Sequence, residues 1–217
     1  MEIYEIYNDF EVNELEVDKM KVTQRQIQKE QTKEKILKAA YYEFGKKGIM
    51  ATRTSDVAKA AGVSHGTVFA HFKTQEELIT AVIENFDERM VKRIHELAEN
   101  CSGIREVLSA HLQGIEEFED FYTRLVMEIR LLPETSRTTF ISLQSGISFH
   151  LNKVLNEEMN KGEIVKLPIY FLFNTWNGLI NYYLVNSDLF APDESVIARY
   201  GDELLNDFMK LIECKKI

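Results

Sequence analysis

Apolar side chains recur at intervals of three and four residues along most of the chain, which is the spacing of one helix face. No stretch shows the alternation and hairpin turns that are typical of strands. The predicted fold class is therefore all-α, with about nine helices and no sheet. The expected helices cover residues 30–47, 54–61, 64–71, 75–99, 104–119, 121–132, 134–161, 168–186 and 193–214, with breaks at Gly162 and at residues 187–191.

Proline and threonine positions support several of these boundaries. Pro133, Pro168 and Pro192 each precede a long helical pattern, and proline is tolerated in the first turn of a helix. Thr74, followed three residues later by Glu77, fits a capping box at the start of the fourth helix. We therefore expect helices to begin at these four places.

The segment from Leu167 to Ser187 contains no charged residue and is long enough to span a bilayer. It nevertheless contains four asparagines, and amide groups are costly to place in hydrocarbon. A helix buried inside the protein is therefore the favoured interpretation, and a membrane span is the alternative.

The composition is that of an ordinary globular protein: 217 residues, 45% hydrophobic and 28% charged. Cys101 and Cys214 lie far apart and form no CxxC motif, which argues against a disulfide framework and a cysteine-built zinc site. The acidic N-terminal residues lack the basic region of a secretory signal. A cytoplasmic location is the expectation.

Charge is unevenly distributed along the sequence. The net charge is −9, yet residues 20–80 contain eleven Lys and Arg against six Asp and Glu. A basic segment in an acidic protein is a candidate for binding phosphate groups. A lysine-rich helix face in contact with solvent gives the same count, so charge alone leaves both interpretations open.

Residues 32–79 show the pattern of a helix-turn-helix. Two short helices, 54–61 and 64–71, are separated by a turn in which Gly62 can take a positive φ and Ser64 can cap the second helix. Such a second helix can enter a DNA major groove with its N-terminal residues at the base edges. The small core expected around these helices consists of Ile36, Leu37, Ala40, Phe44, Val57, Ala58, Ala61, Val63, Val68, Phe69 and Phe72.

This region resembles the TetR family of bacterial transcription regulators. The matching strings are KILKAAYYEF (35–44), Gly48, TRTSDVA (52–58), AGVSHGT (61–67), VFAHFK (68–73) and EEL (76–78). The resemblance implies a homodimer whose N-terminal domains bind successive major grooves of a two-fold symmetric double-stranded DNA operator. It also implies a C-terminal helical domain that holds a small effector and releases DNA when the effector is bound.

Carried over by position, the resemblance implies a set of DNA contacts that includes one departure from the family pattern. Phe69 occupies a place where the family usually has a tyrosine whose hydroxyl contacts phosphate. The hydroxyl groups in the set can equally satisfy free N–H groups at helix starts, so a purely structural role stays open for them. The expected DNA-binding residues are Thr54, Ser55, Ser64, His65, Gly66, Thr67, Phe69, His71 and Lys73.

The C-terminal helices are rich in large apolar residues, and an ordinary helical core explains most of them. The segment 168–186 is apolar nearly all round, so two faces have to be buried. The family resemblance implies that the last two helices form the dimer interface and that the other face lines a pocket for a small apolar or amphipathic effector. The candidate pocket residues are Phe118, Tyr122, Met127, Phe140, Trp176 and Tyr183.

The expected domain organisation has three parts. Residues 1–29 are an N-terminal extension, 30–80 the helix-turn-helix domain, and 81–217 the regulatory and dimerisation domain. Lys21, Arg25 and Lys29 are candidates for a basic arm beside the DNA, and translation starting at Met20 is an alternative to the longer N-terminus.

Catalytic and metal-binding motifs are not found in the sequence. The five histidines are scattered, without an HExxH pair, and no GxSxG, Walker-type or dinucleotide fingerprint occurs. We therefore predict no enzyme activity, no metal and no cofactor. The favoured function is a repressor released by an effector; the alternatives are a DNA-binding protein of the same fold that acts through a protein partner, and a membrane or enzyme module using residues 167–187.

Overall fold

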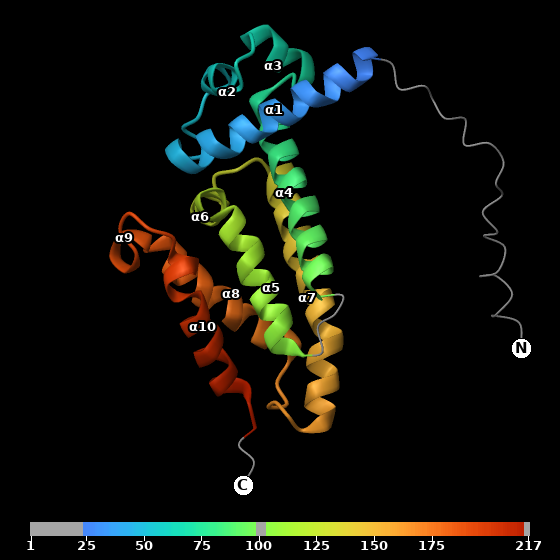
Figure 1. Cartoon of the computed structure of the whole chain (residues 1–217), viewed down its shortest axis with the longest axis vertical. Coiled ribbons are helices and arrows are strands. Elements are labelled where there is room, and N and C mark those ends of the chain that lie inside the picture. Colours follow the sequence, from blue (N-terminus) through green and yellow to red (C-terminus); the bar gives the residue numbers. More distant parts are fainter. Residues whose placement is uncertain (1–23, 99–102, 215–217) are drawn as a thin grey trace, which may run out of the picture. The chain divides into compact units, whose positions relative to one another are not determined.

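The computed structural model describes residues 24–98 and 103–214, and this part of the chain contains ten α-helices and no strand (Figure 1). One isolated antiparallel bridge joins Ile164 to Glu213. The all-α class is confirmed. The helices are α1 (Gln24–Lys47), α2 (Thr54–Ala61), α3 (His65–His71), α4 (Gln75–Ala98), α5 (Ile104–Glu117), α6 (Glu119–Glu128), α7 (Glu134–Lys161), α8 (Ile169–Val185), α9 (Ser187–Phe190) and α10 (Val196–Ile212).

Residues 35–217 form one compact unit and residues 1–34 a second. Of the second unit, the structure describes residues 24–34, which are the N-terminal part of α1. The expected extension over residues 1–29 falls largely outside the described residues, as does Lys21 of the expected basic arm. The expected boundary between residues 80 and 81 lies inside α4, and the division into three domains stays a prediction.

The helix-turn-helix core is built largely as the apolar pattern predicts. Ile36, Val57 and Val68 are fully buried, and Phe72 is nearly so. The expectation that Phe69 belongs to this core is wrong, because 41% of its surface is exposed. Val68 is the buried residue of α3, and the residue directly after it points about 100° away from the buried side of the helix.

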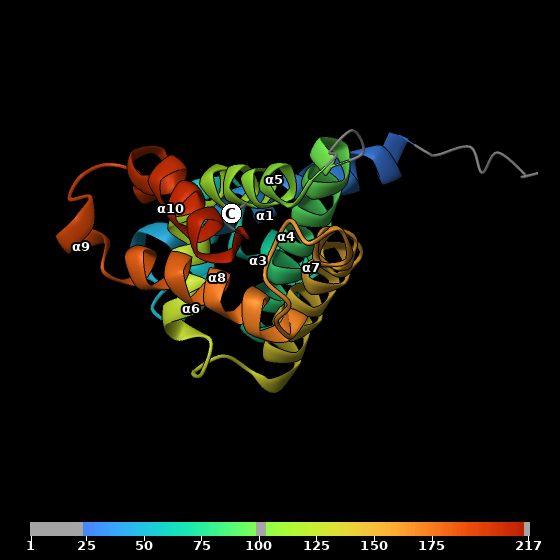
Figure 2. The same ribbon diagram turned by 90° about the horizontal axis from the view of Figure 1, so that it is seen from below.

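Behind this core, α4 packs against α5 and α7, and α10 packs against α5 and α8. Figure 1 shows α4, α5 and α7 running beside one another, and Figure 2 shows α8 in contact with both α7 and α10. The largest fully buried side chains here include Phe86, Met90, Tyr122 and Trp176.

The starts of α1 and α10 differ from the sequence prediction by more than two residues. The first helix begins at Gln24 and not near residue 30, because residues 24–30, polar except for Ile27, fit a helix without supplying an apolar stripe. Pro133 and Pro168 directly precede α7 and α8 as expected. The interpretation of Pro192 is wrong: α10 begins at Val196, after Ser195, whose hydroxyl accepts a hydrogen bond from the Ala198 N–H.

The predicted break at residues 187–191 contains the short helix α9, which accounts for the tenth helix. The expected capping box at Thr74 forms in part. The Thr74 hydroxyl accepts a hydrogen bond from the Glu77 N–H at 3.0 Å. The Glu77 carboxylate, however, accepts from the N–H of Lys73 and not from that of Thr74.

The α8 helix buries one broad face and exposes another. Leu172, Phe173 and Trp176 are buried, whereas Tyr170 is 69% and Tyr182 59% exposed. Of the two faces expected to be buried, the single chain covers one, because the interior takes up only one side of the helix. Among the described residues, no helix combines the length and the apolar character needed to cross a membrane.

Candidate DNA-binding site and its link to the C-terminal helices

The turn between α2 and α3 has the geometry that the sequence predicts. Gly62 adopts φ 66°, in the left-handed region, and its N–H bonds to carbonyls at the end of α2. The Ser64 hydroxyl oxygen accepts a hydrogen bond from the Thr67 N–H at 3.0 Å, which caps α3. These two contacts set the angle at which α3 leaves the turn.

The N-terminal ends of α2 and α3 meet at the surface. Thr54 Oγ1 lies 2.9 Å from His65 Nε2, and Ser64 Oγ lies 2.8 Å from Thr67 Oγ1. Ser64, His65 and Gly66 are exposed. A Cβ added at Gly66 would have only the Ser64 hydroxyl within 4 Å, at 3.8 Å, so the fold itself leaves this position open.

The ring of Phe69 lies against His65, with ring centroids 4.7 Å apart and the planes nearly perpendicular. An edge-to-face contact of this kind restricts the orientation of the imidazole ring. Ser55 and Lys73 are exposed, and His71 is half-buried at the end of α3. The structure thus joins Thr54, His65 and Phe69 into one surface group.

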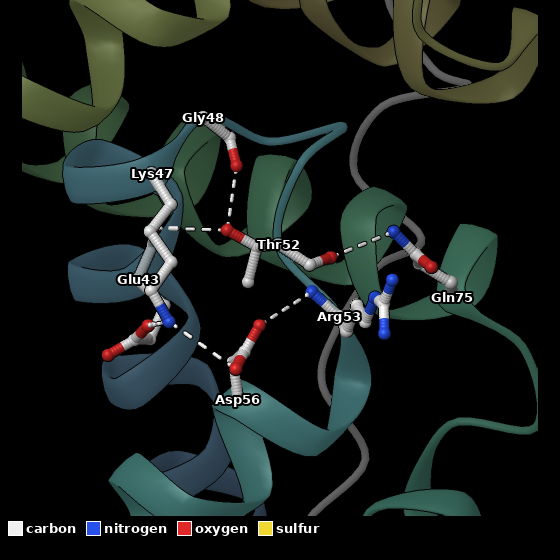
Figure 3. A network of polar contacts seen from close by, with 7 residues as sticks. All are labelled: Glu43, Lys47, Gly48, Thr52, Arg53, Asp56 and Gln75. Carbon is white, nitrogen blue, oxygen red and sulfur yellow. Dashed lines mark hydrogen bonds and ion pairs between the residues drawn. The ribbon is translucent and has the colours of Figure 1, made fainter.

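A charged network holds the end of α1 to the start of α2 (Figure 3). The Lys47 ammonium lies 2.6 Å from Glu43 and 3.4 Å from Asp56, and the Asp56 carboxylate accepts a hydrogen bond from the Arg53 N–H at 3.1 Å. The bond to the Arg53 backbone is the main cause that lowers the pKa of Asp56, and the bond to Glu43 is the main cause that raises the pKa of Lys47.

The buried Thr52 provides the centre of this turn, and sequence reasoning did not single it out. Its hydroxyl donates to the carbonyls of Gly48 at 2.7 Å and Glu43 at 3.1 Å, near the end of α1. Its own carbonyl accepts from the Gln75 side chain at 3.0 Å (Figure 3). Thr52 therefore connects α1 to the start of α4.

The α6 helix contacts the same turn from the C-terminal side. Arg124 Nε donates to the Gly45 carbonyl at 3.2 Å. The Glu128 carboxylate accepts from the N–H groups of Ile49 at 3.2 Å and Met50 at 2.8 Å. A Cβ at Gly45 would lie 2.8 Å from the Asp120 Cβ, so glycine is what allows α1 and α6 to approach this closely.

The six candidate pocket residues do not surround one cavity. Tyr122 is buried, with its ring centroid 6.3 Å from that of Phe140. Trp176 lies beside Phe208, at 5.0 Å between ring centroids. Tyr183 stacks on Phe190, with 4.1 Å between the ring centroids.

The remaining two candidates, Phe118 and Met127, line an open groove of about 980 Å³ between the end of α1, α6 and the α8–α10 connection. Seven carboxylate residues also line this groove, so its walls are mainly acidic. The assignment of the six residues to an effector pocket stays a prediction.

His111 is a buried polar residue that the sequence did not connect to Trp176. Its Nδ1 accepts a hydrogen bond from Trp176 Nε1 at 3.0 Å, and burial lowers its pKa from 6.5 to about 4. His111 is therefore neutral near pH 7. Within the described residues, no group of three His, Cys, Asp or Glu side chains is placed to hold a metal ion.

An exposed recognition helix on a glycine turn, anchored to a larger helical body, defines the class of helix-turn-helix DNA-binding regulators. Comparison with known proteins gives the family. Residues 36–82 match the model for bacterial regulatory proteins of the tetR family. The chain is 31% identical over 174 residues to the probable HTH-type transcriptional regulator ArpR of Pseudomonas putida, covering 73% of this chain and 83% of that protein.

The chain belongs to the TetR family, as its sequence predicts. It is 26% identical over 182 residues to the fatty acid metabolism regulator protein of Bacillus subtilis, covering 78% of this chain and 94% of that protein. The crystal structure of FadR from Bacillus subtilis in complex with stearoyl-CoA shares the fold, with a TM-score of 0.69, 20% identity, and coverage of 82% and 97%. The protein is a DNA-binding transcriptional regulator and not an enzyme.

Proposed function

We propose that the protein is a homodimeric repressor that binds a two-fold symmetric operator and releases it when a small, largely apolar or amphipathic effector binds among its C-terminal helices. The observation that carries this proposal is the position of α6. Through Arg124 and Glu128 it contacts the α1–α2 turn, and through Tyr122 it reaches the interior next to α8. Movement of α6 on effector binding would therefore displace the DNA-binding helices.

In this proposal, the N-terminal end of α3 reads the bases. His65, Gly66 and Thr67 are the first three residues of that helix, where the base edges of a major groove would lie. Lys73, Ser55 and His71 flank them and would contact phosphates, which supply affinity without sequence discrimination. On the described part of the expected basic arm, Arg25 and Lys29 are exposed.

The proposed dimer interface uses α8 and α10. Tyr170, Phe171 and Tyr182 give α8 an exposed aromatic face, and Leu211 of α10 is 70% exposed. A Cβ at Gly178, on the same face of α8, would have no atom within 4 Å, which leaves room for the backbone of a second helix. Exposed apolar surface of this kind is typical of a protein interface.

The apolar character proposed for the effector is supported by the aromatic residues of α6, α7 and α8. The Bacillus subtilis relative is by name a regulator of fatty acid metabolism. The structure of FadR from Bacillus subtilis, which shares the fold of this chain, was determined in complex with stearoyl-CoA. The alternative of a DNA-binding protein that acts only through a protein partner is not favoured by these relatives.

Nuclease footprinting on the DNA upstream of the protein's own gene tests the proposal. At about 0.15 M salt with random DNA as competitor, we expect a protected, two-fold symmetric site. Candidate amphiphiles are then added to the complex, and loss of protection identifies an effector. Weak, salt-sensitive protection of all sequences, or a specific complex that no amphiphile dissociates, would contradict the proposal.

A further inference from the structure

A cluster of four uncharged polar side chains lies between α6, α7 and α8, where Tyr122 is buried and Gln144, Asn177 and Asn181 are half-buried. Tyr122 Oη donates to Asn181 Oδ1 at 3.2 Å, and Asn177 Nδ2 donates to Gln144 Oε1 at 2.7 Å. Asn177 and Asn181 are four residues apart on α8, so they share one face of that helix. Burying amides is costly unless they are hydrogen-bonded, so a cluster at this place needs an explanation.

Each hydrogen bond of the cluster has a defined donor and a defined acceptor. Burial raises the pKa of Tyr122 to about 12, and a hydrogen bond with Gln144 opposes part of that rise. Tyr122 and Asn177 are the donors of the two bonds, and Asn181 and Gln144 are their acceptors. The nitrogen of Asn177 faces Gln144, so its oxygen is not part of that bond.

One polar atom of the cluster has no hydrogen-bond partner. Asn177 Oδ1 is buried and accepts no hydrogen bond within the described residues. An unpartnered buried acceptor is unfavourable by itself, and the group that satisfies it has to bring a hydrogen-bond donor.

Within the described part of the chain, the two hydrogen bonds of the cluster involve no charged side chain. α8 has none, and α7 has none between Arg137 and His150. On α6, Arg124 and Glu128 bond to the α1–α2 turn, and the carboxylate of Glu119 accepts from the N–H groups of Val196 and Ile197 at the start of α10. An anionic group buried beside Asn177 Oδ1 would meet a second acceptor without a proton between them, which is unfavourable.

We infer that the Tyr122–Gln144–Asn177–Asn181 cluster binds the polar group of the effector, and that this group is neutral and carries a hydrogen-bond donor, such as a hydroxyl or an amide N–H on an apolar chain. Phe140, with its ring centroid 6.3 Å from that of Tyr122, supplies apolar surface for that chain. The inference rests on the proposed function and specifies the chemistry of its effector.

Three probes with the same alkyl chain and different polar groups test the inference: dodecanamide, dodecanol and dodecanoate. Thermal unfolding of the full-length protein is followed with each probe below its micelle-forming concentration. We expect the amide and the alcohol to raise the melting temperature and the carboxylate to have little effect. Equal shifts with the carboxylate, or no shift with any probe, would overturn the assignment.

Asn177→Leu is the main variant, and Asn160→Leu, the same change at an exposed position of α7, is the matched control. Asn177→Leu removes the unpartnered acceptor and also the donor to Gln144 Oε1, so we expect it to melt below wild type, and we expect its affinity for the amide, measured well below that melting temperature, to fall about tenfold or more. Gln144→Met removes the acceptor of the Asn177 hydrogen bond. We expect this variant also to show a smaller rise in melting temperature with dodecanamide. Unchanged affinity in both variants would refute the role of the cluster.

Binding to the upstream DNA is measured on the same samples. We expect Asn177→Leu to bind that DNA as the wild type does and to stay bound when dodecanamide is added. Failure of the wild-type protein to bind any specific DNA would count against the proposed function, whereas normal DNA binding with an unchanged response in Asn177→Leu would count against the cluster alone.

Discussion

The buried pair of His111 and Trp176 predicts a defined dependence of stability on pH. Burial lowers the pKa of His111 to about 4 in the folded protein, while the unfolded chain has the usual 6.5. Because the unfolded state binds the proton more tightly, this residue stabilises the fold above pH 6.5 and loses that contribution as pH falls toward 4. The full difference in the free energy of unfolding is on the order of 3 kcal/mol, of which about 2 kcal/mol is lost by about pH 5.

The matched variant is His111→Asn, which keeps an acceptor near the position of Nδ1 for the Trp176 N–H but does not titrate. Urea unfolding of both proteins at about pH 7.5 and about pH 5 gives the free energies of unfolding. All other titratable groups are the same in the two proteins. The difference between their changes in the free energy of unfolding therefore isolates His111. We expect wild type to lose about 2 kcal/mol more than the variant. Equal losses would refute the reasoning, since His111 would then be free to take up a proton inside the fold.

Three further predictions concern DNA binding and assembly. His65→Ala should relax sequence preference, whereas Lys73→Ala should weaken binding to all sequences and reduce the salt slope by about one; titrations on operator and random DNA separate the two effects, and equal losses on both would contradict them. Gly66→Ala should leave stability equal or higher by up to about 1 kcal/mol, because the position is open, and yet reduce operator affinity; an unchanged affinity would mean that no DNA group approaches Gly66. Tyr182→Glu should convert the dimer to monomers in analytical ultracentrifugation, since it places a charge on the exposed aromatic face of α8; an intact dimer would exclude that face as the interface.

The helix-turn-helix was predictable in detail because its signals are local. The positive φ of Gly62 and the cap by Ser64 each depend on a few neighbouring residues, and both are found as expected. The boundaries of α2 and α7 also match, since apolar spacing and flanking Gly or Pro agree at those sites. Pro192 misled because the same residue fits a turn as well as a first helical turn.

The contacts between distant segments could not be predicted. The bonds from Glu128 to Ile49 and Met50 join residues almost eighty positions apart, and no local pattern indicates which carboxylate faces which N–H. The exposure of Phe69 and Tyr170 depends on which side of a helix the rest of the chain covers, which apolar spacing alone does not reveal. The amides of α8 were noted as polar groups in an apolar segment, but their partners on α6 and α7 came only from the structure.

The bonds at the two ends of α6 also define a length. Glu119 is fixed to the first N–H groups of α10 and Glu128 to the α1–α2 turn, and α6 between them has 10 residues, or about 15 Å. In a dimer joined through α8 and α10, this helix would set how far each recognition helix stands from the two-fold axis. The spacing of the operator half-sites would then be encoded in the residue count of α6, and an inserted or deleted turn would select an operator of different length.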